Sequence, residues 1–597
     1  MGNCFDTCHT GELKSYANLY NQKVKIRITA NKTVMADFER AVPTRTTSTD
    51  FFYFRQLYGT FDHIVVGAGA SGAIIATRLS EDPHRTVLLL EAGGHETDFT
   101  DIPAMAEICE LLDYNWNFAS VPQNNSCLSS NNRQCLYSRG KAIGGSTVIN
   151  GLFYSRGNAR DYDEWKDMGN DGWGSEEVLT FYKKLENYKI DVDPGYHGYD
   201  GYMNIEYVYP DNLKTAMFLN ANRELGITIG DYNGEYPICA GKAQLNNING
   251  RRGSTGRMYL RRVYKDRNNL IMSPHSYVTK ILINPQTKRA YGVIFAKNKK
   301  YYVATSRKEI VLSAGSFGSP QLLMLSGIGP RDHLTSLGIP LIRDLPVGNF
   351  LQDHLSFSTL YFTSNLSEPR DSGLEAKIRD YLQSRGVLTY GFCLATAFVE
   401  TNLSQIRNHP DIEILLHKYL HALDNGSPGL DKSKLFATHI LLLHPKSVGT
   451  VRLNSSNPFI YPLIDPNFFS DAENEDMETM YGGIQIALQL LETQAFKQHN
   501  VRLIYTQEPE CQLYEYLSKE HWFCQLKQLS ASYSHPTGTC RMGPNSSESV
   551  VNHKLRVHGT SNLIVADASV MPDTISGHPS AACMMIGEKA SHMIRNG

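Results

Sequence analysis

The stretch that decides the fold is Asp62-His63-Ile64-Val65-Val66-Gly67-Ala68-Gly69-Ala70-Ser71-Gly72. Its apolar run predicts a fully buried strand, and the glycines that follow predict a turn into a helix. A second apolar run, Thr86 to Leu90, ends on Glu91. A glycine-rich surface turn would not require such continuous Val, Ile and Leu runs, so the pattern favours a parallel sheet of the α/β class.

The spacing of the glycines is that of a dinucleotide-binding turn. Gly67 permits the tight turn, Gly69 lets the backbone approach a pyrophosphate, and Gly72 lets the next helix pack closely on the strand. The predicted helix, Ala73–Leu79, points its positive N-terminal end toward the phosphates. Glu91 lies about 20 residues beyond the last glycine, where a carboxylate accepts hydrogen bonds from an adenosine ribose.

Length and composition are those of a large globular enzyme. The chain has 597 residues, which is too long for one hydrophobic core, so two or more cooperating units are expected. The net charge is −2 and no block of Lys and Arg occurs, which argues against a nucleic-acid or acidic-membrane partner. No apolar run reaches the length of about 20 residues that spans a bilayer, so no membrane span is predicted.

Cysteine usage favours an oxidising compartment. Cys127 and Cys135 flank a polar loop, and Cys4 and Cys8 are close in sequence, so both pairs suit local disulfides. Cys4 and Cys8 followed by His9 also suit a metal site, but no second ligand pair completes it. The first residues lack the basic start and apolar stretch of a signal peptide, as in a cytosolic protein or a mature secreted chain. Because of the cysteines we expect a secreted, extracellular protein.

Two further features bear on secretion. The eleven cysteines are an odd number, so at least one is unpaired, and Cys540 and Cys583 lie in apolar stretches typical of core thiols. Acceptor sequons for N-glycosylation support a secreted glycoprotein. They begin at Asn31, Asn124, Asn365, Asn402, Asn425, Asn454 and Asn545.

Strands of the same apolar type recur far from the first turn. Glu309-Ile310-Val311-Leu312-Ser313 leads into Ala314 and Gly315, and the run from Leu563 to Ala566 ends on Asp567. Strands of this type at both ends of the chain predict one nucleotide-binding domain built from separated segments, with a second domain inserted between them.

The rest of the chain has weaker patterns. Residues from Asp161 to Tyr188 are predicted to be helical, and strands and turns are predicted from there to about Tyr232. The segment from His354 to Pro445 mixes helical and strand patterns.

Four long signatures carry a resemblance to a known family. They are Gly140–Trp165, Gly315–Gly329, Ser534–Gly543, and Val565–Pro572 with Ser576–Ala581. In this order they resemble the glucose–methanol–choline (GMC) oxidoreductases, flavoproteins that oxidise alcohols, over about Phe61 to Ile594. Cys127, Cys135 and Gly169–Trp173 look most like the secreted arthropod branch, which includes glucose dehydrogenase-like proteins, salicyl alcohol oxidases and mandelonitrile oxidase.

The resemblance implies a fold with two domains. A discontinuous Rossmann-like FAD-binding domain would accompany an α+β substrate domain with an antiparallel sheet. The implied division is an N-terminal arm (1–57), an N-terminal region that is mostly FAD-binding (58–350), part of the substrate domain (351–445), and a C-terminal region with the catalytic histidines (446–594).

The resemblance also implies where FAD binds. Gly144, Gly145 and Ser146 match a second pyrophosphate-binding segment. A histidine carries the flavin bond in covalent members, and Ile149 stands in its place, so FAD is expected to be non-covalent. The full set of implied cofactor residues is Gly67, Ala68, Gly69, Ser71, Gly72, Glu91, Ala92, Gly140, Gly144, Gly145, Ser146, Asn150, Gly151, Leu152, Val278, Ala314, Asp567, Ala568, His578 and Pro579.

Two histidines are the implied catalytic residues. Alcohol oxidation needs a base for the hydroxyl proton while the α-hydrogen leaves as hydride, and a neutral imidazole suits the base. His535 is the predicted base, and His578 is predicted to hydrogen-bond the substrate oxygen and stabilise its alkoxide character. Pro346–His354 departs from the family pattern at Phe350, and His354 is predicted to be a capping or hydrogen-bonded residue. No resident metal is predicted.

The predicted function is FAD-dependent oxidation of a small-molecule alcohol, with oxygen or another acceptor reoxidising the flavin. An aryl alcohol or a cyanohydrin such as mandelonitrile is the favoured substrate, and an oxidase is favoured over a dehydrogenase. No carboxylate stands out as the partner of a cationic substrate. The alternatives are an FAD-containing hydroxynitrile lyase without net redox chemistry, and a sugar dehydrogenase of the glucose type. A catalytically silent protein of this fold is disfavoured by the retention of His535 and His578.

Overall fold

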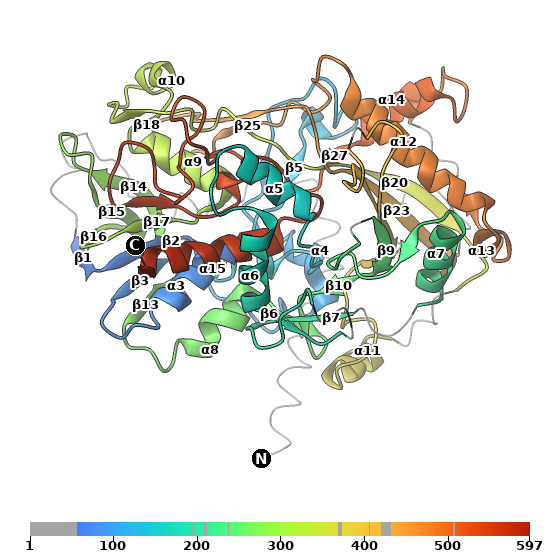
Figure 1. Ribbon diagram of the computed structural model, residues 1–597, viewed down its shortest axis with the longest axis horizontal. Coiled ribbons are helices and arrows are strands. Elements are labelled where there is room, and N and C mark those ends of the chain that lie inside the picture. Colours follow the sequence, from blue (N-terminus) through green and yellow to red (C-terminus); the bar gives the residue numbers. More distant parts are fainter. Residues whose placement is uncertain are drawn as a thin grey trace.

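The computed structural model of the protein describes residues 56–596, apart from positions 191, 193–194, 208–211, 237, 368–372, 405, 419–430 and 505–507 (Figure 1). The predicted pair Cys4 and Cys8 and nearly all of the predicted N-terminal arm lie outside the described residues. Gln56 and Leu57 belong to strand β1 (Gln56–Phe61), so this strand starts slightly before the predicted end of the arm.

The glycine turn lies at the end of the middle strand of a five-stranded parallel sheet. The strand order is β13-β3-β2-β17-β28, and every neighbouring pair is parallel. The bounds are Leu270–Ser273 (β13), Val87–Leu90 (β3), His63–Val66 (β2), Ile310–Leu312 (β17) and Leu563–Val565 (β28). Strand β28 joins from the far end of the chain, so the predicted discontinuous domain is confirmed.

Two helices from opposite ends of the chain cover this sheet together. Helix α3 (Ala70–Leu79) packs on β2 and β3, and helix α15 (Ser580–Asn596) packs along α3 (Figure 1). A four-stranded sheet, with the order β1-β16-β15-β14, lies next to them. Its other bounds are Lys300–Ser306 (β16), Ala290–Lys297 (β15) and Tyr277–Ile283 (β14), and helix α9 (Gly315–Leu325) packs on β14.

A largely antiparallel sheet of eight strands forms the other half of the molecule, on the right in Figure 1. Its order is β26-β20-β23-β22-β21-β9-β8, and β27 also pairs with β20; only β8 and β9 are parallel neighbours. The bounds are Arg502–Leu503 (β26), Leu355–Thr363 (β20), Leu435–Leu442 (β23), Ile412–Lys418 (β22), Cys393–Val399 (β21), Cys239–Lys242 (β9), Thr228–Ile229 (β8) and Ala531–Ser532 (β27). This agrees with the predicted antiparallel sheet of the substrate domain.

Helices cover one face of the antiparallel sheet. Helix α12 (Glu475–Gln489) packs on β22 and β23, and helix α7 (Leu213–Glu224) packs on β21 and β9. Helix α7 lies where the sequence predicts strands and turns, so that prediction was wrong. The predicted helical segment from Asp161 onward is confirmed as α5 (Ala159–Asp167) and α6 (Ser175–Leu185), but its end, Glu186–Tyr188, is strand β6.

Shorter elements connect these layers. The helices are α4 (Ala106–Cys109), α8 (Arg261–Val263), α10 (Arg331–Ser336), α11 (Gly373–Leu382), α13 (Gln494–Lys497) and α14 (Lys519–Leu529). The strands are β4 (Phe118–Ala119), β5 (Leu136–Tyr137), β7 (Met203–Tyr207), β10 (Gln244–Leu245), β11 (Asn247–Ile248), β12 (Arg251–Arg252), β18 (Ile328–Gly329), β19 (Arg343–Asp344), β24 (Thr450–Arg452) and β25 (Leu463–Asp465).

Each large sheet has its own hydrophobic core. The first core surrounds the parallel sheet and includes Ile64, Leu89 and Val311; the second surrounds the antiparallel sheet and includes Phe362 and Ile414. Two cores of this size agree with the expectation, from length alone, of two cooperating units. Among the described residues, no helix has both the length and the apolar character needed to span a bilayer.

Among the described residues, two disulfides join segments that lie around the second core. The predicted bond Cys127–Cys135 is confirmed, and a second bond, Cys511–Cys524, was not predicted. Cys540 is a free, buried thiol, as predicted, and Cys583 is free and partly buried. Of the predicted sequons, the five within the described residues begin at exposed asparagines: Asn124, Asn365, Asn402, Asn454 and Asn545.

Candidate active site

The glycine turn after β2 is packed backbone against backbone. Gly67 has a φ of +97°, and a Cβ on it would lie 2.3 Å from the carbonyl oxygen of Ser313. A Cβ on Gly72 would lie 2.0 Å from the carbonyl oxygen of Gly67. Helix α3 begins directly after Gly69, and no side chain caps it. The first amides of the helix therefore remain available to an anionic ligand.

The second predicted glycine segment lies directly against the first. Gly144 donates its N–H to the carbonyl of Ala68 at 2.8 Å. A Cβ on Gly145 would lie only 2.5 Å from the Cα of Gly69. The N–H of Gly140 donates to Oγ of Ser146 at 3.0 Å, which holds the segment in shape. Two glycine-rich loops that meet at Gly69 and Gly145 thus form one cradle, and this fits a pyrophosphate that both backbones approach.

Glu91 ties the cradle to the next strand. Its carboxylate accepts the N–H of Ala68 at 2.9 Å and the N–H of Gly93 at 2.8 Å, and burial raises its pKa. Each oxygen keeps a further lone pair for a ribose hydroxyl. The main chain of Glu91 accepts the N–H of Ser276, so strand β14 with Val278 begins beside it. Glu91, the predicted ribose ligand, and Val278, another predicted cofactor residue, therefore lie on neighbouring segments.

The side-chain hydroxyl of Ser71 is engaged within the protein and does not donate to the cofactor. Its hydroxyl donates to the carbonyl of Cys583 at 2.7 Å and so joins α3 to α15. Only its backbone amide, in the first turn of α3, remains for the cofactor.

The segment Asn150–Leu152, three of the predicted cofactor residues, includes one residue with positive φ and contacts the buried guanidinium of Arg252. Leu152 has a φ of +67°, and its N–H donates to Oδ1 of Asn150 at 3.2 Å. The guanidinium of Arg252 donates to that same oxygen at 2.8 Å and to the carbonyl of Asn150 at 2.7 Å. Arg252 is completely buried, and burial lowers its pKa. A Cβ on Gly151 would meet the Phe392 ring at 2.8 Å. The sequence analysis did not identify Arg252.

The C-terminal cofactor residues meet the N-terminal ones through Asp567. Its carboxylate accepts the N–H of Gly315 at 2.9 Å and the hydroxyl of Ser319 at 2.6 Å, which fixes the start of helix α9 after Ala314. It also accepts the N–H of Ser569 at 2.9 Å. Ala92 follows β3, Ala568 follows Asp567, and Pro579 directly precedes α15.

The two predicted catalytic histidines face each other. The ring centroids of His535 and His578 lie 4.7 Å apart with the rings at 72°. The ring of Tyr533 lies 5.2 Å from His535 and 5.6 Å from His578, and the ring of Phe153 lies 4.4 Å from His578. Two separate segments of the C-terminal region, one with Tyr533 and His535 and one with His578, therefore converge with Phe153, which directly follows Asn150–Leu152.

His535 is held by Asp353 and His354, the last two residues of the segment Pro346–His354. The backbone N–H of His535 donates to Oδ1 of Asp353 at 2.8 Å, and the ring Nδ1 of His535 lies 3.0 Å from Nδ1 of His354. The prediction that His354 is a hydrogen-bonded histidine is confirmed, and its partner is His535 itself. Asp353 was missed; it also accepts the hydroxyl of Ser532.

Burial keeps His535 and His354 neutral. Desolvation, and then the charges of His578 and His354, hold the pKa of His535 well below its usual range. Desolvation lowers the pKa of His354 to about 3. Burial raises the pKa of Asp353 to about 7, against the hydrogen bonds that it accepts. A neutral imidazole at His535 meets the first requirement of a general base.

A buried carboxylate lies next to His578. Oε2 of Glu413 is 3.2 Å from Nε2 of His578, an ion-pair distance without the alignment of a hydrogen bond. The other oxygen of Glu413 accepts the hydroxyl of Thr396 at 2.8 Å. The sequence analysis missed Glu413. The signal was a charged residue between Ile412 and Ile414 in the segment that forms strand β22 (Ile412–Lys418).

The same strand carries a second polar group toward the site. Nε2 of His417 lies 3.2 Å from the hydroxyl of Tyr533, and its ring stacks on that of His439 at 3.6 Å. Among the described residues, Nδ1 of His417 and Nδ1 of His439 are buried without a hydrogen-bond partner. Burial lowers the pKa of His439 to about 3 and places that of His417 well below its usual range. Both rings are neutral.

Comparison with family models agrees with this site. The two models described as GMC oxidoreductase match residues 61–356 and residues 445–587. The first match contains both glycine loops, Glu91 and Asp353, and the second contains His535 and His578, the two predicted catalytic histidines.

Curated relatives are similar over most of their length. A glucose dehydrogenase [FAD, quinone] of Drosophila pseudoobscura pseudoobscura is 35% identical, covering 90% of this chain and 87% of the relative. An ecdysone oxidase of Bombyx mori is 33% identical, covering 90% and 82%. Among solved structures, pyridoxine 4-oxidase from Mesorbium loti has a TM-score of 0.79 at 25% identity, covering 90% of this chain and 99% of that one.

Proposed function

We propose the following reaction for this chain, which belongs to the GMC oxidoreductase family and uses FAD: oxidation of an alcohol to its carbonyl compound. The observation that carries the proposal is the facing pair of His535 and His578 at 4.7 Å between ring centroids. FAD, when bound in the glycine cradle, supplies the acceptor for the hydride that leaves the alcohol carbon.

His535 is the general base. Its Nδ1 is engaged with Nδ1 of His354, so Nε2 is the nitrogen that takes the hydroxyl proton. This assignment requires the tautomer in which His535 Nδ1–H donates to His354 Nδ1, and the low pKa of both rings supports two neutral partners. Asp353 fixes the main chain of His535 and does not touch its ring nitrogen in this arrangement.

His578 orients the substrate and stabilises negative charge on its oxygen. The Glu413 carboxylate 3.2 Å from Nε2 favours a proton on that nitrogen. Nδ1 of His578 then remains to bind the substrate oxygen. A second proton, on Nδ1, makes the ring an imidazolium, and the buried carboxylate stabilises this form because it offsets the positive charge. The two histidines thus take different roles because only one of them has a carboxylate partner.

The substrate class favoured by the family branch is an aryl alcohol or cyanohydrin, and one observation favours a second class. The unpartnered Nδ1 atoms of His417 and His439 would be satisfied by a further hydroxyl group of the substrate. A site built this way rejects substrates that leave its polar atoms unpaired. The second candidate is therefore a polyhydroxylated, sugar-type alcohol.

A panel of alcohols distinguishes these candidates. Purified holoprotein is mixed anaerobically with aryl alcohols, mandelonitrile and sugars, and flavin bleaching is followed. Bleaching identifies an oxidoreductase and its substrate class, whereas release of aldehyde and cyanide with a yellow flavin identifies a lyase. Peroxide formation in air, compared with dye reduction, then separates an oxidase, which we favour, from a dehydrogenase.

We also propose that the protein is secreted and glycosylated. The disulfides Cys127–Cys135 and Cys511–Cys524 support an oxidising compartment, and the exposure of five sequon asparagines supports glycan attachment. Mass mapping of protein made in a eukaryotic secretion host would find glycans at these asparagines. Unmodified asparagines at all five would contradict the proposal.

A further inference from the structure

A single buried carboxylate joins helix α5 to the loop that carries His578. Asp161 is the third residue of α5, and its carboxylate accepts the N–H of Ser576 and the hydroxyl of Ser576, each at 2.7 Å. It also accepts the N–H of Asn158 at 2.8 Å, which closes the capping box of the helix. The anchor point on the loop, Ser576, lies two residues before His578.

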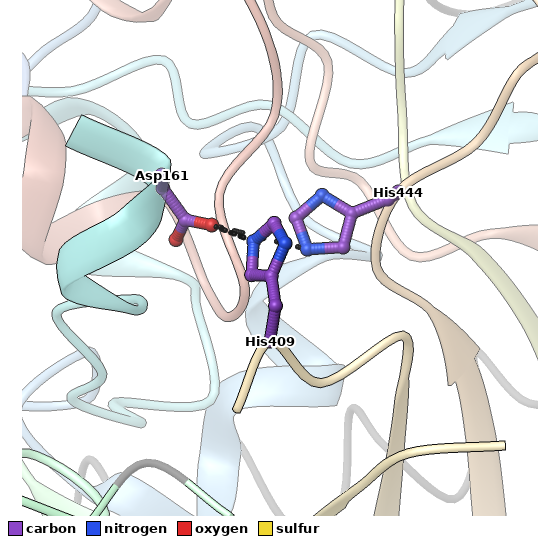
Figure 2. A group of neighbouring side chains, drawn as sticks. All are labelled: Asp161, His409 and His444. Atoms are coloured by element: carbon purple, nitrogen blue, oxygen red, sulfur yellow. Dashed lines mark hydrogen bonds and ion pairs between the residues drawn. The ribbon is translucent and has the colours of Figure 1, made fainter. Parts of the chain in front are cut away.

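Two imidazoles complete this cluster. Figure 2 shows the Asp161 carboxylate pointing toward the rings of His409 and His444. Nε2 of His409 lies 2.8 Å from Oδ1 of Asp161, and Nε2 of His444 lies 2.9 Å from the hydroxyl oxygen of Ser576. Burial lowers the pKa of His444 to about 4, so this ring is neutral and its N–H donates to Ser576, whose own proton goes to Asp161. The hydrogen bonds therefore form a directed chain.

The donor set is one that could also bind zinc, but the hydrogen bonds favour a different role. Two imidazoles and a carboxylate are common zinc ligands. Here both oxygens of Asp161 accept hydrogen bonds from Ser576, and the Nε2 atoms of His409 and His444 are each at hydrogen-bond distance from an oxygen. The cluster is satisfied by its own members.

The loop has little freedom on either side of Ser576. Thr574 donates its hydroxyl to the carbonyl of Leu443 at 3.0 Å and its N–H to Gln352 at 3.1 Å. Gly577 has a φ of +154°, and a Cβ there would lie 2.1 Å from Oγ of Ser155. The backbone directly before His578 is thus fixed from three segments.

We propose that Asp161 and Ser576 are positioning residues that hold the His578 ring beside His535 and Glu413. The proposal rests on the proposed function only for the role of His578. Asp161 is buried and its carboxylate binds Ser576, so it acts on His578 through Ser576 and the short loop. Displacement of a reacting group by about 1 Å costs on the order of 100-fold in rate, so a small shift of this loop is measurable.

The test uses the holoprotein with two substitutions and a matched control. Ser576→Ala removes only the hydroxyl, and Asp161→Asn replaces one of the two carboxylate oxygens by an NH2 group, so Ser576 loses one of its two acceptors on this side chain. Asp167→Asn changes an exposed carboxylate on the same helix. We expect both test variants to keep FAD content and substrate KM, to slow anaerobic flavin bleaching by about 10-fold or more, and to raise hydrogen exchange in residues 574–579. Asp167→Asn is expected to match the unmodified protein in all four measurements.

A double-mutant cycle separates positioning from a general structural role. In a His578→Ala background, Asp161→Asn and Ser576→Ala should cost nothing further in bleaching rate, because the residue through which they act is gone. Fully additive losses would overturn the proposal, as would stoichiometric zinc that is lost in Asp161→Asn. If no alcohol bleaches the flavin of the unmodified protein, the proposed function fails. Hydrogen exchange then tests the positioning role by itself: unchanged protection of residues 574–579 in Ser576→Ala overturns that role.

Discussion

Oε2 of Glu413 lies 3.2 Å from Nε2 of His578, and the neighbours of Glu413 on its strand, Ile412 and Ile414, are apolar. This carboxylate is completely buried, and its second oxygen is engaged by Thr396. A buried charge is costly unless it has a partner, so the pair is maintained by mutual compensation. It is also what makes His578 different from His535.

Glu413→Gln removes this charge and keeps the shape of the side chain. We expect the anaerobic rate of flavin bleaching to drop by about 10-fold or more, because His578 loses the carboxylate beside its Nε2. FAD content and the melting temperature serve as controls for folding. A bleaching rate equal to that of the unmodified protein would show that the carboxylate has no part in orienting or charging His578.

The pH dependence of bleaching tests the state of His535. A histidine base accepts a proton only when it is neutral, that is, above its pKa. The pKa of His535 lies well below its usual range, so the rate should stay constant as the pH falls from 8 through 6.5 and should decline only at lower pH. An unshifted base would be half-protonated at a pH of about 6.5. Asp353→Asn, measured in parallel, identifies any inflection that comes from Asp353, whose pKa is raised to about 7.

The environment of Ile149 predicts how the flavin is held. Ile149 is buried and apolar where covalent relatives carry a histidine, so no histidyl bond to FAD forms at this position. Acid or heat precipitation should release all yellow colour into the supernatant. Flavin that stays with the pellet after denaturation would require another attachment residue.

The bond Cys127–Cys135 closes a short loop next to the segment that leads to His535. The N–H of Cys127 donates to the carbonyl of Ser530. Replacing both cysteines by serine should lower stability by about 2–3 kcal/mol, seen as a lower melting temperature, with FAD content unchanged. The double serine variant of Cys511 and Cys524 gives the matched comparison. Two free thiols at Cys127 and Cys135 in natively produced protein would contradict the bond.

The parts of the site that the sequence predicts are those set by local chain geometry. Gly67, Gly69 and Gly72 lie within one turn, and the positive φ of Gly67 and the contact of Gly72 with the Gly67 carbonyl are local, whereas the contacts of Gly67 with Ser313 and of Gly69 with Gly145 are long-range. His535 and His578 were identified through the long signatures around them. The position of each relative to the other could not be derived from spacing, because it depends on the packing of two separate loops.

The parts that were missed depend on long-range register. Glu413 faces His578 only because β22 pairs with β21 and β23 in one register, and a shift by one residue would turn it to the other face. Asp353 meets His535 across a similar distance in sequence. Helix α7 was missed because its buried residues include Lys214, Thr215 and Asn222, so no simple apolar stripe marks it.

The central claim is that His535 is the base that takes the hydroxyl proton of the alcohol, and its most direct test is the anaerobic bleaching rate of His535→Ala. The claim predicts a protein that still binds FAD but bleaches about 100-fold or more slowly with the alcohol identified from the panel, while His578→Asn, which keeps a hydrogen bond to the substrate oxygen, loses less than His578→Ala. Bleaching of His535→Ala at the rate of the unmodified protein would contradict the claim.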